Sequence, residues 1–190
     1  MHSNTTKSIY LLDLRLYAQS MRKIVLNILV VLVSFSLSNF VYAEDKKLNE
    51  TELNFFTGMF DFSDDKQAAG LIGLQHQNDD LFRGSFLGKL SPITGGFVTK
   101  NSAVYLYTGA QAEYDFGIFT VTPSFAPGYY NYGDGKDLGS ALEFKSEIQM
   151  SLNLSDSTEF GMSYNHISNA SLGEKNPGAN SYMINFLKQF

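Results

Sequence analysis

The chain has 190 residues, no cysteine, 14 basic and 19 acidic residues, and an aromatic content of 14%. Without cysteine it cannot be a small disulfide-stapled scaffold or use a thiolate in catalysis, so its stability must come from a packed core or from closure of a sheet. The acidic balance argues against a nucleic-acid partner, because too few cations are present to neutralise phosphates.

Residues 21–43 have the organisation of a secretory signal peptide: two basic residues, an apolar stretch, and small residues up to Ala43. Two asparagines and several serines interrupt the apolar stretch, which favours cleavage after Ala43 over an uncleaved membrane anchor. We therefore expect an N-terminal extension plus cleaved signal peptide over 1–43, with Met21 as the start. Residues 44–190 are expected to form a single domain.

The expected mature part retains 10 basic and 18 acidic residues, a net charge of −8. No stretch in it approaches the roughly 20 apolar residues of a membrane-spanning helix. Short aromatic and β-branched runs separated by turn residues predict eight strands instead. These runs cover 52–62, 69–77, 81–98, 103–114, 118–130, 141–154, 159–168 and a final segment that ends at Phe190.

Several runs alternate between two kinds of side chain, as a sheet with two different faces requires. In a soluble sandwich the apolar set would face inward, whereas in an outer-membrane barrel it faces lipid and the polar set lines the interior. Tyr105, Tyr107, Leu142 and Phe144 mark the apolar set, and Glu143, Lys145, Glu147 and Gln149 mark the polar set.

Three features favour the membrane barrel. Eight strands of roughly 9 to 14 residues suit a small closed barrel, and 11 tyrosines suit aromatic girdles at the membrane interfaces. The C-terminal alternation of Tyr182, Ile184, Phe186 and Phe190 looks like the assembly signal of outer-membrane barrels, although Lys188 interrupts it. We expect an all-β, eight-stranded antiparallel transmembrane barrel in the outer membrane of a Gram-negative bacterium. A soluble lipocalin-like barrel is the alternative.

His166 and Ser168 stand two residues apart in the run 159–168. On a strand both side chains leave the same face, about 6 to 7 Å apart at Cα, so the imidazole can meet the serine hydroxyl. Taken alone, the spacing more often marks two polar barrel positions near a rim.

The longer phrase H-I-S-N-A-S-L-G-E-K-N-P-G-A-N, residues 166–180, resembles the H-x-S-N…N-x-G signature of the lipid A 3-O-deacylase family, the PagL-type outer-membrane esterases. The resemblance covers about residues 50–190 and implies an eight-stranded barrel whose site lies on the outer surface, where lipid A approaches laterally. Further similar phrases are K-L-S-P-I-T-G-G-F-V-T at 89–99, Y-L-Y-T-G at 105–109, T-P-S-F-A-P-G-Y-Y at 122–130 and G-K-D-L-G-S-A-L-E-F-K at 135–145.

The resemblance implies a role for each matching residue. Ser168 corresponds to the nucleophile that attacks an ester carbonyl, and His166 to the base that takes its proton and later protonates the leaving group. Asn169 resembles the residue assigned to oxyanion stabilisation. Asn176 matches the loop asparagine beside the site.

The chain departs from the family pattern two residues after Gly178. Family members commonly carry a glutamate there to orient the histidine, whereas this chain has Asn180. An amide oxygen can accept the Nδ1–H bond, but it cannot stabilise an imidazolium as a carboxylate does, and in a serine protease the acid-to-amide change costs about 10⁴ in rate. We expect Asn180 to orient His166, with Glu174 of the same loop as the alternative third member.

The function expected from the resemblance is a serine esterase that removes an ester-linked 3-hydroxyacyl chain from the 3-O position of lipid A. Its expected partners are lipopolysaccharide and outer-membrane lipid, with neither a cofactor nor a metal ion. Homodimer formation and a phospholipid substrate stay open. The alternatives are a non-catalytic structural barrel of the OmpA or OmpX kind and an inactive relative of the deacylases.

Other candidate residues carry weaker signals. His76 has no serine at catalytic spacing, which favours a strand-end or interior polar position. Residues 134–137 could suggest a cation loop, but their Gly and Asp content is typical of a solvated turn. Glu143 and Glu147 share a strand face with Lys145, which indicates a polar barrel lining rather than a glycosidase pair.

Overall fold

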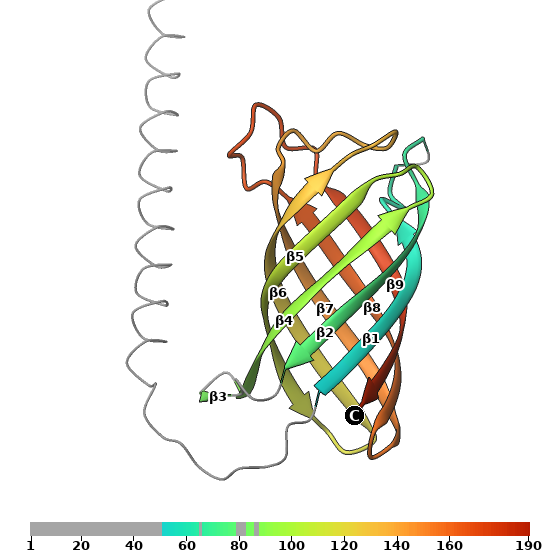
Figure 1. Ribbon diagram of the computed structural model, residues 1–190, viewed down its shortest axis with the longest axis vertical. Coiled ribbons are helices and arrows are strands. Elements are labelled where there is room, and N and C mark those ends of the chain that lie inside the picture. Colours follow the sequence, from blue (N-terminus) through green and yellow to red (C-terminus); the bar gives the residue numbers. More distant parts are fainter. Residues whose placement is uncertain (1–50, 65, 79–82, 86–87) are drawn as a thin grey trace, which may run out of the picture. The chain divides into compact units, whose positions relative to one another are not determined.

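The computed structural model describes residues 51–64, 66–78, 83–85 and 88–190. These residues form a closed antiparallel β-barrel (Figure 1). The strands are β1 (Thr51–Phe60), β2 (Ala69–Asn78), β3 (Arg83–Ser85), β4 (Gly88–Thr99), β5 (Val104–Asp115), β6 (Phe119–Asn131), β7 (Leu142–Ser155), β8 (Thr158–Ser168) and β9 (Ala179–Gln189). Their order is β2-β1-β9-β8-β7-β6-β5-β4-β3, and pairing of β2 with β4 closes the ring. The predicted all-β, eight-stranded barrel is confirmed.

The expected extension and signal peptide lie outside the described residues. The described part of the chain contains no candidate for a membrane-spanning helix.

The predicted strand over 81–98 is wrong in one respect, because the structure divides it into β3 and β4. Arg83 pairs with Leu90 and Ser85 with Gly88, so β3 folds back onto the start of β4 as a short hairpin. Apolar alternation is the same along one continuous strand and along the two arms of a hairpin, and it could not separate the two cases.

The connections differ between the two ends of the barrel. Tight turns join β5 to β6 and β7 to β8 at the end where the C-terminus lies, whereas longer loops join β1 to β2, β6 to β7 and β8 to β9 at the other end (Figure 1). Short turns at one end and longer loops at the other are typical of outer-membrane barrels, where the long loops are extracellular.

The outer face of the barrel carries exposed apolar side chains on its strands. Such a surface would be costly in water but suits the hydrocarbon of a bilayer. The C-terminal alternation is confirmed, because Tyr182, Ile184 and Phe186 all point outward from β9. Other members of this outer belt include Phe55, Ile72, Leu74, Leu106, Phe125, Tyr129, Leu142, Ile148, Met150, Leu152, Phe160, Met162 and Tyr164.

The interior toward the long loops is aromatic, which corrects the predicted orientation of Tyr105 and Tyr107. Both tyrosines are buried inside the barrel, while Leu142 points outward as expected. The Tyr105 hydroxyl donates to the carbonyl oxygens of Ala126 and Glu143, each at 3.0 Å. Alternation separates two faces but does not identify the inner one, and a phenol whose hydroxyl finds a partner suits either side.

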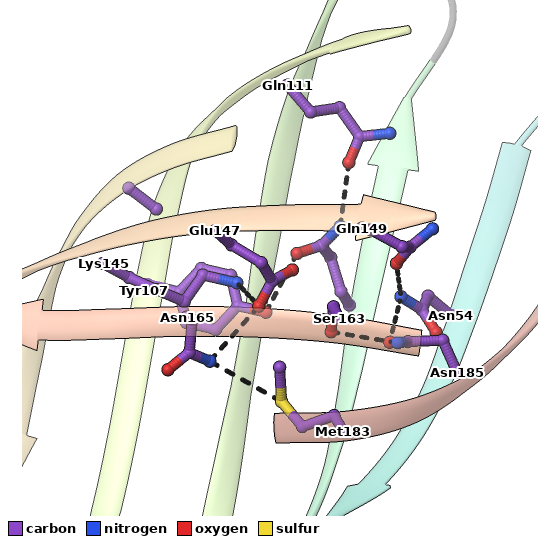
Figure 2. A network of polar contacts seen from close by, with 12 residues as sticks. Asn54, Tyr107, Gln111, Lys145, Glu147, Gln149, Ser163, Asn165, Met183 and Asn185 are labelled. Atoms are coloured by element: carbon purple, nitrogen blue, oxygen red, sulfur yellow. Dashed lines mark hydrogen bonds and ion pairs between the residues drawn. The ribbon is translucent and has the colours of Figure 1, made fainter. Parts of the chain in front are cut away.

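The rest of the interior is a network of polar side chains (Figure 2). Lys145 Nζ lies 3.3 Å from Glu147 Oε2 and 4.0 Å from the centre of the Tyr107 ring. Asn54 donates to Gln149 at 3.1 Å. The polar lining predicted for β7 is therefore confirmed. The bond from Asn54 of β1 to Gln149 of β7 joins strands that are not neighbours in the sheet, and such networks make the barrel wall more rigid.

Candidate active site

His166 and Ser168 lie on the outer face of β8, close to the long-loop end. Their neighbours Asn165, Ile167 and Asn169 have exposed fractions of only 1%, 0% and 0%, because they point into the barrel. Strict alternation therefore turns His166 and Ser168 outward. A substrate in the membrane could reach both side chains without entering the lumen.

His166 contacts Asn180 of β9, its direct partner in the antiparallel register. The His166 Nδ1 atom lies 2.8 Å from Asn180 Oδ1. Hydrogen bonds in the described part of the chain do not engage His166 Nε2, which leaves that nitrogen for proton transfer. Glu174, the alternative third member, is exposed, and within the described part of the chain it forms no hydrogen bond or ion pair with His166.

Ser168 makes no hydrogen bond within the described part of the chain, so the expected contact between its hydroxyl and the His166 imidazole is not formed in this structure. Its register partner is Phe144 of β7, which places an aromatic side chain beside the hydroxyl on the outer face. Catalytic hydrogen bonds are often long without substrate and tighten when the reacting complex forms.

The register places a second serine beside the histidine. Ser146 of β7 is exposed on the outer face and stands directly opposite His166. Opposite residues of an antiparallel pair have Cβ atoms about 5 Å apart, which is closer than the roughly 6.5 Å between positions i and i+2 of one strand. Sequence spacing alone could not reveal Ser146, because it depends on the register of β7 against β8.

Asn169 does not offer its side chain to an oxyanion. Its Nδ2 donates to the carbonyl oxygens of Leu138 at 2.9 Å and Lys175 at 2.8 Å, inside the barrel mouth. Its backbone N–H donates to Asn176 Oδ1 at 3.1 Å. Asn169 therefore ties the β6–β7 loop to the β8–β9 loop, and both of its amide hydrogens are used in these bonds.

Asn176 is exposed in the β8–β9 loop beside Ser168 and Asn169. Because its Oδ1 accepts the Asn169 N–H, the amide has a fixed direction and its Nδ2 group is turned away from that bond. Of the two asparagines, Asn176 is the one with an NH₂ group available for a developing negative charge.

An ion pair joins the same two loops at the surface. Lys175 Nζ lies 2.7 Å from Asp137 Oδ2, and this hydrogen bond, with one from the Gly139 N–H, lowers the pKa of the Asp137 carboxyl. The expected solvated turn at 134–137 is therefore only partly correct. Lys136 leaves solvent to form a 2.7 Å ion pair with Asp61, which is 1% exposed.

The other sequence candidates lie away from this site. His76 lies on the outer face of β2, two residues before the strand ends, and pairs with Leu53 and Thr94. Glu147 lies inside the barrel with Lys145. Two residues that the sequence did not single out, Tyr164 and Ser63, form hydrogen bonds to the Asn180 amide.

Comparisons with known proteins agree with this geometry. The family model described as "Lipid A 3-O-deacylase (PagL)" matches residues 71–188. The lipid A deacylase PagL of Bordetella bronchiseptica is 36% identical over 106 residues, which are 54% of this chain and 55% of that protein. This chain thus aligns with about half the length of that curated relative.

One solved structure shows the same fold. The crystal structure of the outer membrane enzyme PagL superposes with a TM-score of 0.58 at 18% identity, covering 72% of this chain and 98% of that one. A de novo designed transmembrane β-barrel has a TM-score of 0.48 at 10% identity, covering 77% of this chain and 100% of the design.

The fold, the apolar outer belt and the family match together place the chain among the outer-membrane β-barrels. Because the family model spans more than half of the sequence, including β8, β9 and the loop between them, the chain belongs to the lipid A 3-O-deacylase (PagL) family.

Proposed function

We propose that this protein is a serine esterase that hydrolyses the ester-linked 3-hydroxyacyl chain at the 3-O position of lipid A. The observation that carries the proposal is the 2.8 Å contact between His166 Nδ1 and Asn180 Oδ1 on the outer face, two residues from Ser168. A structural barrel has no need for this arrangement on a surface that exposes mainly apolar side chains.

The contact with Asn180 selects a productive state of the histidine. When Asn180 Oδ1 accepts a hydrogen bond, Nδ1 carries the proton and Nε2 is left with a lone pair. Nε2 can then act as a general base. In this arrangement Asn180 orients the ring, as the third member of a triad does.

Ser168 attacks the ester carbonyl carbon in the first half of the proposed reaction. As the new bond from Oγ forms, the hydroxyl proton passes to His166 Nε2, and the carbonyl oxygen becomes an oxyanion. The bond from the carbonyl carbon to the sugar oxygen then breaks, and the leaving sugar oxygen takes the proton from Nε2. The products of this half are a 3-hydroxyl on the sugar and an acyl group on Ser168.

Water completes the reaction by the same route. His166 Nε2 takes a proton from the water as its oxygen attacks the acyl-enzyme carbonyl. The bond from that carbon to Ser168 Oγ then breaks, which releases the 3-hydroxy fatty acid, and the proton passes from Nε2 to Oγ. Asn176 Nδ2 supports the oxyanion in both halves. A donor of this kind contributes roughly 3 to 4 kcal/mol to lowering the barrier.

The outward position of the site supports a membrane lipid as substrate. Phe144 and Leu142 flank Ser168 on β7 and offer apolar contacts to an acyl chain. The long-loop end is the extracellular end in outer-membrane barrels, and the lipid A leaflet faces that side. The acyl ester would therefore meet Ser168 without leaving the membrane.

The test is mass spectrometry of lipid A from cells that express the wild type, Ser168→Ala or Ser146→Ala. We expect loss of one 3-hydroxyacyl chain, with release of the free 3-hydroxy fatty acid, in the wild type and in Ser146→Ala but not in Ser168→Ala. Activity lost only in Ser146→Ala would transfer the nucleophile to β7. Unchanged lipid A in all three strains, or release of acyl chains from phospholipid alone, would overturn the proposed substrate.

A further inference from the structure

Three consecutive residues of the β1–β2 loop enclose Asn180. Asp61 Oδ1 accepts the Asn180 backbone N–H at 3.4 Å, and the Phe62 N–H donates to the Asn180 carbonyl oxygen at 3.0 Å. Ser63 Oγ accepts from Asn180 Nδ2 at 3.3 Å. The backbone and one end of the side-chain amide are thus held by a segment almost 120 residues away in sequence.

Tyr164 holds the other end of the amide. Its hydroxyl donates to Asn180 Oδ1 at 2.8 Å, the same oxygen that lies 2.8 Å from His166 Nδ1. The Tyr164 ring leans edge-on against Phe62, with centroids 6.3 Å apart. Phe62, whose N–H donates to the Asn180 carbonyl oxygen, therefore also fixes the position of Tyr164.

The direction of the Asn180 amide decides which nitrogen of His166 is basic. If the amide turned by 180°, its NH₂ group would donate to Nδ1 and the ring proton would move to Nε2. That tautomer cannot take a proton from Ser168. A carboxylate at the same position has two acceptor oxygens, so the family's usual glutamate does not face this choice.

We propose that Tyr164 is a positioning residue that sets the direction of the Asn180 amide, with Ser63 as its counterpart at the other end. A phenol delocalises its oxygen lone pair into the ring, so it is a better donor and a poorer acceptor than an aliphatic hydroxyl. Tyr164 therefore favours the amide orientation in which Asn180 Oδ1 faces its hydroxyl. In the same orientation Asn180 Nδ2 donates to Ser63. This pair compensates for the missing carboxylate, and the proposal rests on the function proposed above.

Tyr164→Phe tests the proposal with a change of one hydroxyl group. Loss of one hydrogen bond that holds the amide should lower kcat about tenfold and leave KM nearly unchanged, because Tyr164 acts through Asn180. The matched control is Tyr182→Phe. Tyr182 stands directly opposite Tyr164 on β9 and packs against Phe62 at 5.3 Å, but its hydroxyl makes no hydrogen bond in the described part of the chain.

The effect should disappear when position 180 carries a carboxylate. In an Asn180→Glu background, Tyr164→Phe should change kcat less than about twofold, since either oxygen of the glutamate can accept from Nδ1. A tenfold loss in both backgrounds would show that the hydroxyl supports the fold or contacts the substrate, and would overturn the assignment. The shift between folded and heat-unfolded bands on gels verifies that every variant forms the barrel.

A readout of the tautomer separates this proposal from the proposed function. Nitrogen NMR of ¹⁵N-histidine-labelled protein in detergent micelles, assigned with His76→Asn, should show His166 protonated at Nδ1 in the wild type and in Tyr182→Phe. Tyr164→Phe should move part of the signal toward the Nε2-protonated form. If the wild type is as inactive as Ser168→Ala, the esterase function fails, while an unchanged tautomer in Tyr164→Phe overturns the positioning role.

Discussion

The backbone of Gly178 lies against the edge of the His166 imidazole. A methyl group at this position would come within 2.8 Å of His166 Cε1 and 3.3 Å of Nε2. Gly178 also has a φ of +62°, a left-handed conformation that favours glycine. The end of the β8–β9 loop therefore leaves no room for a side chain beside the edge of the ring that carries Nε2.

Gly178→Ala should displace the ring and lower turnover by about two orders of magnitude, because small misplacements of a catalytic group are costly. The control is Gly117→Ala at the opposite end of the barrel. Its φ of +86° imposes similar strain, but its added methyl would meet no atom within 4 Å. Release of 3-hydroxy fatty acid from lipid A measures the turnover of both variants. Equal losses of turnover would show that backbone strain, rather than the contact with the ring, is responsible.

The second prediction concerns Asn180, the position at which the chain departs from the family pattern. Asn180→Glu should raise turnover, since a carboxylate fixes the tautomer and also stabilises the imidazolium formed as Ser168 attacks. Asn180→Ala should lower turnover, and Glu174→Ala should change it little, because Glu174 forms no hydrogen bond or ion pair with the ring in the described residues. The same fatty-acid assay, with Ser168→Ala as the blank, compares the three variants. A large loss in Glu174→Ala with no change in Asn180→Ala would contradict the assignment.

A period of two in the sequence predicted most of the strands and a shared face for His166 and Ser168, whereas only the family resemblance implied that this face is the outer one. The same alternation also gives the directions of two side chains that the interpretation of the motif did not use. Asn169 directly follows Ser168 and so must point into the barrel, whereas Tyr164 is two residues before His166 and must share its face. Tyr164 and the inward role of Asn169 were therefore accessible from spacing alone.

The rest of the site depends on contacts that have no local signal. Asp61 and Ser63 lie 119 and 117 residues before Asn180, and only closure of the barrel brings β1 beside β9. Ser146 meets His166 through the register of β7 against β8. Such a register is set by turns and by packing of the whole lumen, which a single sequence does not encode in any short phrase.

Asn169 carries the third prediction, which concerns the rim of the barrel. Asn169→Ala removes the amide that links the carbonyls of Leu138 and Lys175, and it should cost roughly 1 to 3 kcal/mol for each buried group left unpaired. Activity should fall as well, since the linked loop carries Asn176. The midpoint of heat unfolding on gels measures the loss. Lys175→Ala is the control, because it cuts only the exposed ion pair with Asp137 and keeps the backbone carbonyl.

The last prediction tests how the β1–β2 loop is anchored over the site. Asp61 is 1% exposed and its partner is Lys136, at 2.7 Å. Removing one partner of a buried pair leaves an uncompensated charge, so Lys136→Met should destabilise the barrel by about 3 to 5 kcal/mol. Lys100→Met is the control, since Lys100 is exposed in a turn at the same barrel end and forms no ion pair in the described residues.

The consequence for activity separates anchoring from simple stability. Because Asp61 accepts the Asn180 N–H, freeing the loop in Lys136→Met should also reduce turnover at temperatures where the barrel is still folded. Adding Asp61→Asn removes the unpaired charge while keeping an oxygen that can accept from Asn180, so the double variant should recover much of both losses. The thermal gel shift measures the stability of each variant, and fatty-acid release measures its turnover. Recovery of stability without recovery of turnover would mean that the carboxylate, and not the position of the loop, is what Asn180 requires.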